Sequence, residues 1–144
     1  MGHRARNVPT LTVGVPWITD TYGRSATWVY NSFATWLPHV DLDLHKRVAL
    51  PDLAPLDGEP LPTAAEFRAA LQREIAGSDI GSDALVSLTD AASMLGASRQ
   101  TILRHHGEAL RLRRIGAAFV VSRDAIVDLL CAKRVVPSRK AVTA

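Results

Sequence analysis

The sequence predicts a mainly α-helical chain with short β-hairpins, in which one plan of two helices followed by a hairpin is used twice. Three observations lead to this fold class. Short apolar helical patterns are interrupted by single glycines, basic segments of alternating polarity follow them, and the pattern of residues 88–130 recurs in residues 15–56. A length of 144 residues, 47% of them hydrophobic and 22% charged, suits one globular domain or two small ones.

The clearer of the two segments, residues 88–130, begins with a helix. Thr89 and Asp90 are typical of a helix start, because a side-chain oxygen can accept hydrogen bonds from free backbone N–H groups and an acid faces the positive end of the helix dipole. We expect this helix to end at Leu95, since Gly96 can take the left-handed conformation that turns the chain.

Ser98 is then placed to cap a second helix, Arg99–His106, which Gly107 ends. Two short helices joined by a tight turn cross steeply, and the small Ala91 and Ala92 allow their backbones to approach. The apolar filling is expected from Met94, Leu95, Ile102 and Leu103. The side chains left facing outward on the second helix are Arg99, Gln100, Thr101, Arg104 and His105. With Ser98 at the cap, these are donors that reach phosphates and base edges when a helix lies in a major groove.

Residues 110–121 predict a two-stranded hairpin with Gly116 at its turn. Leu110 and Leu112 alternate with arginines, which puts one face of the hairpin in the core and one basic face in water. The basic face carries Arg111 and Arg113, and Arg114 is the third arginine expected to contact DNA from this wing. Ser122 then caps a final helix that is apolar on one side. Helix, turn, helix, basic hairpin and supporting helix together describe a winged helix-turn-helix unit.

This segment resembles the excisionase and MerR-like family of small winged-helix DNA-binding domains. The resemblance is carried by Ala92, Gly96 and Ile102, at the spacing A-x3-G-x5-I, and by the run LRLRRIGAAFVVSRDAI that follows. It covers about a third of the chain. The resemblance implies DNA binding, as a transcription regulator or a recombination directionality factor, in a phage or another mobile element. A plain helical hairpin beside a β-ribbon is the alternative without a nucleic-acid ligand.

Residues 15–56 follow the same template in a degenerate form. Laying Gly23 on Gly96 matches residues along the whole segment: Ser25 with Ser98, Val29 with Ile102, Leu37 with Leu110 and Val48 with Val121. Gly23 would then be the turn and Ser25 the cap. The second helix would cover Ala26–Leu37, which Pro38 stops, and residues 39–43 and 46–50 alternate like the strands of a shorter wing.

The first unit has different residues at the positions that are predicted to face DNA in the C-terminal unit. They are Arg24, Ser25, Thr27, Trp28 and Asn31, with Lys46 and Arg47 on the wing. Six of the eight aromatic side chains fall within residues 17–36. Aromatic rings can stack on unpaired bases, but at helical spacing in a small unit we expect them to form its core.

Prolines mark residues 50–62 as an extended, stiff linker. Thr63 and Glu66 form a capping box that opens a helix over residues 63–76, whose charged face would suit a protein partner. The chain therefore divides into a flexible arm with Arg4 and Arg6 (1–10), an N-terminal winged unit (11–56), a linker with a helix (57–83), a C-terminal winged helix-turn-helix (84–134) and a basic tail (135–144).

The positive charge of the chain is local. Residues 84–144 hold ten Lys and Arg against four Asp and Glu, whereas residues 1–83 hold seven against ten. The excess of positive charge therefore falls on the C-terminal unit and its tail, which is the distribution that phosphate binding requires.

Several classes of function lack their motifs. The sequence has no nucleotide-binding loop, nucleophile elbow or zinc-ligand spacing, and its single Cys131 cannot form an internal disulfide. Asp41 and Asp43 share a strand face without a third ligand or a base beside them. No run of eighteen apolar residues or signal core is present. We therefore expect no enzymatic activity, cofactor, metal, membrane contact or small-molecule substrate, and a cytoplasmic, nucleoid-associated location.

Together these patterns predict a sequence-specific double-stranded DNA-binding protein. It would be a transcription regulator or an excisionase-like recombination factor that reads a bipartite site with two recognition helices. If only the C-terminal unit reads DNA, a homodimer formed through the aromatic-rich half is expected instead. The alternative function is an antitoxin-like DNA-binding protein whose N-terminal half or middle helix binds a protein partner.

Overall fold

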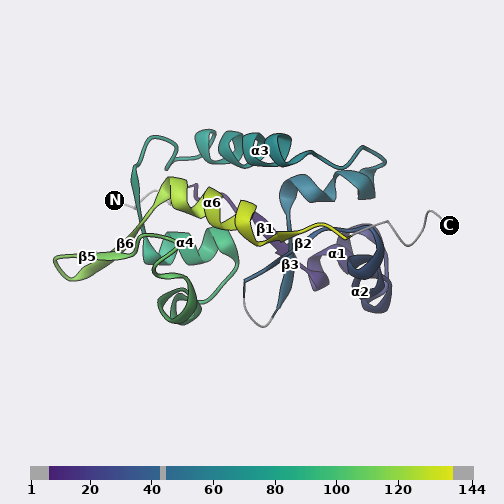
Figure 1. The fold of residues 1–144 in the computed structure, drawn as a ribbon, viewed down its shortest axis with the longest axis horizontal. Coiled ribbons are helices and arrows are strands. Elements are labelled where there is room, and N and C mark those ends of the chain that lie inside the picture. The colour runs from purple at the N-terminus through teal and green to yellow at the C-terminus, as the bar shows by residue number, and fades with distance from the viewer. Residues whose placement is uncertain (1–6, 43–44, 138–144) are drawn as a thin grey trace, which may run out of the picture.

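The structure is a computed structural model that describes residues 7–42 and 45–137. It has a mixed α/β fold, about half helical, with two small antiparallel sheets. Figure 1 shows an elongated molecule in which the helix α3 (Ala64–Ala76) lies along one long side, above two α/β units.

Each half of the chain contributes one sheet with its helices. The first half contains β1 (Thr12–Gly14), α1 (Val15–Tyr22), α2 (Ala26–Thr35), β2 (His39–Asp41), β3 (Lys46–Ala49) and the 3-10 helix η1 (Leu50–Asp57). The second half contains β4 (Leu85–Ser87), α4 (Leu88–Leu95), α5 (Arg99–Thr101), the π-helical turn η2 (Ile102–His106), β5 (Arg113–Ile115), β6 (Ala118–Ser122), α6 (Arg123–Lys133) and β7 (Arg134–Val135).

The two sheets have the same strand order and the same register. The order is β1-β3-β2 in the first and β4-β6-β5 in the second, and β7 extends the first sheet beyond β2. Val13 pairs with Val48, and Val86 pairs with Val121, so each residue of the second pair lies 73 positions after its counterpart. The same shift carries the β2–β3 pairs onto the β5–β6 pairs. The internal repeat that the sequence predicts is therefore present in the backbone.

The turn between the two helices is alike in both halves. Gly23 has φ 66° and ψ 33°, and Gly96 has φ 68° and ψ 29°, both in the left-handed region that favours glycine. Ser25 and Ser98 follow, and each hydroxyl accepts a hydrogen bond from the backbone N–H three residues later. The glycine turns and the serine caps predicted from the sequence are confirmed.

The start of α4 differs from the prediction. Ser87, not Thr89, caps the helix, because its hydroxyl accepts a hydrogen bond from the Asp90 N–H at 3.1 Å. Ser87 ends β4 in an extended conformation, which places its side chain before the first helical turn. Thr89 already lies within that turn, so its side chain is past the capping position.

The chain after Gly96 is also shaped differently from the prediction. The helix is α-helical only over α5 and becomes π-helical over η2, whereas the matching α2 is α-helical throughout. The hairpin begins at Arg113 rather than at Leu110. The N–H groups of Leu110 and Leu112 donate to carbonyl groups at the end of the helix and are therefore not available to a sheet partner. Arg111, between them, has a φ of 55°.

The first part of residues 50–62 is not the extended linker that the prolines suggest, while residues 59–62 are in no helix or strand. Residues 50–57 form η1, which has Pro51 in its first turn and ends at Gly58 with φ 81°. Proline is tolerated there because its fixed φ is helical and the first turn needs no N–H donor. The capping box of Thr63 and Glu66 is confirmed, and it opens α3.

The apolar side chains form two cores. The smaller lies within the first unit and contains Val13, Val15, Ile18, Val29, Phe33, Leu37, Val48 and Leu53. Four of the six aromatic side chains within residues 17–36 lie in or against it, as expected, while Trp17 and Tyr30 are exposed. The larger core joins the second unit to α3 and takes in four residues of the first half: Leu11, Val40, Leu42 and Ala49.

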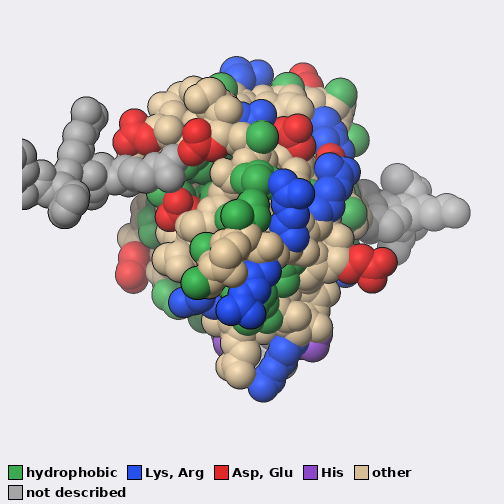
Figure 2. Space-filling view, turned by 90° about the vertical axis from the view of Figure 1, so that its left-hand side faces the viewer, with side chains coloured by type: hydrophobic (Ala, Val, Ile, Leu, Met, Phe, Trp, Pro, Cys, Tyr) green, Lys and Arg blue, Asp and Glu red, His purple; other side chains and the backbone are tan. Residues whose placement is uncertain are grey.

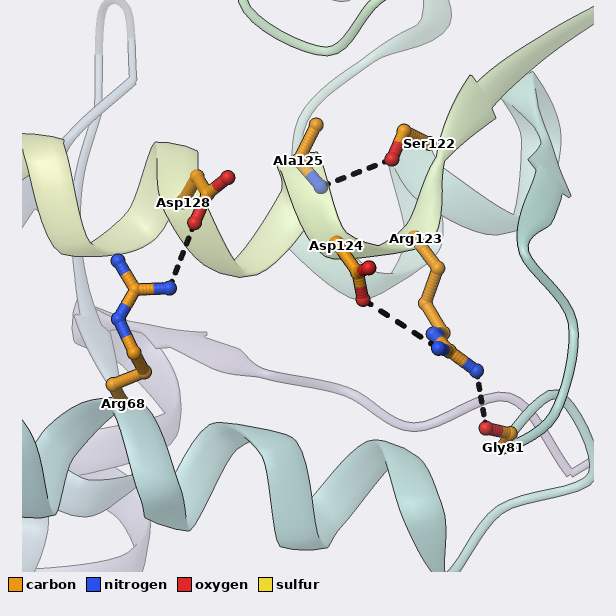
Figure 3. Close-up of polar contacts among 7 residues, drawn as sticks. All are labelled: Arg68, Gly81, Ser122, Arg123, Asp124, Ala125 and Asp128. Carbon is orange, nitrogen blue, oxygen red and sulfur yellow. Dashed lines mark hydrogen bonds and ion pairs between the residues drawn. The ribbon is translucent and has the colours of Figure 1, made fainter.

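The helix α3 is fixed to the second unit along α6. Its buried side chains belong to the larger core: Phe67, Leu71 and Ile75. Figure 3 shows the polar contacts beside them, where Arg68 Nη1 donates to Asp128 Oδ1 at 2.7 Å. Arg123 donates to the carbonyl of Gly81 in the loop after α3. Ser122 caps α6, as predicted.

The predicted arm and tail are partly bound to the fold. The N–H of Asp79 donates to the Asn7 carbonyl at 3.0 Å and Pro9 is buried, so residues 7–10 are not loose. The rest of the arm, with Arg4 and Arg6, lies outside the described residues. At the other end Val135 belongs to β7, and residues 138–144 lie outside the described residues.

We expect His39 to make the stability of the fold depend on pH. It is 6% exposed beside the Phe33 ring, and its Nδ1 has no hydrogen-bond partner among the described residues. Burial, and after it the charge of Lys46, lowers the pKa of His39 below its usual 6.5. The unfolded chain therefore binds a proton below about pH 6.5 that the folded chain does not. The free energy of unfolding should be highest above that pH and fall by up to about 1.4 kcal/mol per pH unit below it.

Urea unfolding across this pH range measures the effect. The loss of stability towards low pH should shrink in His39→Gln and persist in His105→Gln, since His105 is exposed. An unchanged pH dependence in His39→Gln would assign the effect to other groups.

Candidate nucleic-acid interface

The outward face of α5 and η2 is open. Four of the side chains predicted to face DNA are exposed on it: Arg99, Gln100, Arg104 and His105. The opposite side is fixed by Ile102, which is fully buried in the larger core, and by His106, whose Nε2 is hydrogen-bonded to the Leu42 carbonyl. No described part of the N-terminal half covers the outward face.

The start of this helix is ordered by its own side chains. Ser98 Oγ accepts the Thr101 N–H at 3.0 Å and donates to Thr101 Oγ1 at 2.9 Å. Ser98 is exposed and Thr101 is half-buried. Within residues 7–42 and 45–137, Arg99 and Arg104 form no ion pair. Their guanidinium groups are therefore available for a phosphate or the edge of a guanine.

Leu103 belongs to the same face, which the sequence pattern does not indicate. That pattern assigns Leu103 to the core, yet the side chain is 42% exposed. The matching residue of α2, Tyr30, is likewise 54% exposed, so this position faces outward in both units. An apolar side chain among donors can contact the methyl group of thymine.

The β5–β6 hairpin extends this surface. Arg111, Arg113 and Arg114 are all exposed, and Gly116 lies in the tight turn with φ 62°, as predicted. The Arg114 guanidinium lies 5.8 Å from the Phe119 ring, which orients it on the hairpin. Figure 2 views this end of the molecule and shows Lys and Arg side chains running down it, with His side chains at its lower edge.

The matching face of α2 carries much less charge. Thr27 and Asn31 are exposed, but the helix ATWVYNSFAT contains no Lys or Arg. Ser25 is exposed at its cap, and Trp28 is half-buried against the smaller core. The Arg24 guanidinium stacks on the Trp28 ring at 4.7 Å from its centroid. The predicted residues of this unit therefore lie together, but with one cation among them.

The two predicted wing residues of the first unit point in different directions. Lys46 is exposed, whereas Arg47 is turned inward. Arg47 Nε donates to Thr12 Oγ1 at 2.7 Å and its Nη2 donates to the Thr12 carbonyl at 3.1 Å. The guanidinium also packs against Gly96, so Arg47 lies at the junction between the units rather than at the tip of a wing.

Because of this contact, Gly96→Ala should destabilise the protein more than Gly23→Ala. Both glycines have nearly the same positive φ, so both alanines cost about 1–2 kcal/mol of backbone strain. An added Cβ at Gly96 would also overlap the Arg47 guanidinium, whereas nothing lies within 4 Å at Gly23. The extra loss at Gly96 should be about 1–3 kcal/mol in urea unfolding. Equal losses would show that Arg47 moves aside without penalty.

The candidate elements of both units lie on one side of the molecule. Figure 1 places residues 99–106 (green) and α2 (blue) at the lower edge, with the β2–β3 hairpin between them in this view. An open hollow at the junction is lined by His45, Arg47, Ser98 and Thr101 together with apolar residues. No described residue that lines this hollow is acidic.

Other chemistry has little support among the described residues. They contain no group of three His, Cys, Asp or Glu side chains that could hold a metal ion, and Asp43 of the predicted acidic pair lies outside them. Cys131 is half-buried, and burial raises the pKa of its thiol. None of the described helices has the length and hydropathy needed to span a membrane. Comparison with protein-family models, with curated proteins and with solved structures finds no match to this chain.

Proposed function

We propose that the chain binds double-stranded DNA sequence-specifically and that each half is a winged helix-turn-helix unit. The outward face of α5 and η2 is the element that reads bases. The proposal depends on one observation, that the polar side chains of this face are exposed. Gln100 and Arg104 are assigned to base edges, and Arg99 and His105 to the phosphates beside them. The α2 face of the first unit is the second, weaker reader.

The distribution of charge supports this assignment. Arginines on α5, η2 and the β5–β6 hairpin are exposed without ion pairs among the described residues. Such groups release counterions from DNA when they reach phosphates, which provides affinity without sequence preference. Transcription regulation and direction of recombination are the roles that a small binder of this kind would serve.

An antitoxin-like role through α3 has less support. The apolar side of α3 would be the natural docking face for a protein partner. Phe67 and Leu71, on that side, are each 1% exposed because they pack in the larger core of the same chain. A partner would have to use the charged side of α3 instead.

DNA binding as such is tested with a labelled duplex of random sequence, titrated with the full chain at several salt concentrations. Binding at low salt that weakens as salt rises is expected. A chain that leaves the duplex free at the lowest salt concentration would contradict the proposal.

Arg113→Ala should weaken binding to every duplex alike. Arg113 is exposed on the hairpin, where it would meet a phosphate rather than a base. The slope of log affinity against log salt should fall by about one unit. Arg73→Ala is the matched control, since Arg73 is exposed on α3, on the opposite long side of the molecule (Figure 1). A loss confined to one sequence would instead place Arg113 on a base.

A further inference from the structure

We propose that the two units act as one rigid reader, so that their DNA site has a fixed spacing between its two parts. This inference rests on the proposed function and goes beyond it, because two readers on one chain could equally be joined by a flexible linker. Three sets of contacts between the units carry it.

The first set is the strand β7 with its arginine. β7 follows α6 of the second unit directly but pairs with β2 of the first, with Val40 opposite Arg134. The Arg134 guanidinium donates to both carboxylate oxygens of Asp52, at 2.7 and 3.0 Å, and to the Pro62 carbonyl at 2.9 Å. The Asp52 and Arg134 side chains are 1% and 8% exposed. Parting the units here would break this ion pair and its three hydrogen bonds.

The second set joins the start of the first sheet to the end of α4. The Leu11 N–H donates to the Met94 carbonyl at 2.9 Å, and Thr12 Oγ1 donates to the Leu95 carbonyl at 3.0 Å. Thr12 is fully buried, and Arg47 covers it from β3. These bonds end at the helix–turn–helix corner of the second unit, so they fix that corner against the first sheet.

The third set is the shared apolar core. Val40, Leu42 and Ala49 come from β2, the residue after it and β3, yet they pack in the core of the second unit. The Leu42 carbonyl is hydrogen-bonded to the buried His106 at the end of η2. The candidate reading helix is thus attached by its inner side to the first unit as well as to its own.

These contacts remove the freedom that a linker would provide. A flexibly linked pair finds its second half-site at many separations, because the linker adapts to the distance. Here η2 packs in the larger core and α2 in the smaller, and β3 contributes Ala49 to the first and Val48 to the second. Both candidate helices lie on one side of the molecule (Figure 1). A duplex along that side must therefore present its two parts at one separation and one rotation.

The experiment uses the full chain and a duplex selected by it from a random pool. Base pairs are inserted between the two parts of the selected site, about five in one duplex and about ten in another. One turn of DNA is about 10 base pairs, so the longer insertion restores the rotation and changes only the distance. A rigid reader should lose affinity on both duplexes, down to that of either part alone. Recovery on the longer insertion would overturn the proposal.

A second measurement needs no DNA. Spin labels at Asp20→Cys and Ser93→Cys, in a Cys131→Ser background, report the separation of α1 and α4 through exposed, matching positions. One narrow distance distribution is expected, and a broad one would overturn the rigid coupling. If the chain selects no site, both the proposed function and the fixed spacing are refuted. A chain that selects a site but tolerates the longer insertion refutes the rigid reader alone.

Discussion

Arg134→Met should lower the free energy of unfolding by about 3–5 kcal/mol. The Asp52 carboxylate, 1% exposed, accepts two hydrogen bonds from Arg134, and methionine can supply neither. Burial raises the pKa of the Asp52 carboxyl, and the bonds from Arg134 oppose that rise. Removing the arginine alone therefore leaves an uncompensated buried charge, which is far more costly than losing the pair as a whole. Urea unfolding near neutral pH measures the loss.

Arg68→Met is the matched control for this prediction. Arg68 also pairs with a carboxylate at 2.7 Å, but its side chain and that of Asp128 are 43% and 48% exposed. The loss there should be within about 1 kcal/mol, because water screens the pair. The double variant Asp52→Leu with Arg134→Met should be more stable than Arg134→Met alone. Similar small losses in both single variants would contradict the role assigned to the buried pair.

Arg104→Ala should weaken binding to the preferred DNA sequence by about 1–3 kcal/mol and relax the preference at one position of the site. The guanidinium is exposed on η2, beside the exposed Leu103, where it can reach two acceptors of a guanine. The loss on a scrambled duplex should be smaller. Binding curves on both duplexes, recorded at one salt concentration, measure the difference.

Arg113→Ala is the comparison for this prediction, since Arg113 is assigned to a phosphate and should lose affinity equally on both duplexes. The two variants are therefore distinguished by whether the loss of affinity depends on the DNA sequence, not by the size of that loss. Equal losses on both duplexes in Arg104→Ala would remove it from the base-reading set.

The local structure was predictable where one residue type decides it. The positive φ of Gly23 and Gly96 and the caps at Ser25 and Ser98 follow from the residues themselves. The repeat was visible because it has no insertions, so one shift aligned every element. The cap of α4 was placed wrongly at Thr89 because two hydroxyl residues, Ser87 and Thr89, lie close together in the sequence, and only the end of β4 selects Ser87.

The parts that could not be predicted depend on contacts between distant residues. Arg134 and Asp52 meet although they are 82 positions apart, and nothing near either of them in the sequence indicates it. The position of Arg47 after Lys46 predicts a wing residue. In the structure its guanidinium donates to Thr12 and packs against Gly96, so it lies at the junction between the units. Leu103 was assigned to the core because it is apolar, but it is exposed on η2, as its match Tyr30 is on α2.

The most direct test is selection of binding sites from a random pool of duplexes, run in parallel with the native chain and with the double variant Gln100→Ala, Arg104→Ala. If α5 and η2 read bases, the native chain enriches one motif, and the double variant loses preference in one contiguous part of it while keeping the rest. Enrichment of the same full motif by both chains, or of none by the native chain, would contradict the proposal that this helix face recognises DNA sequence.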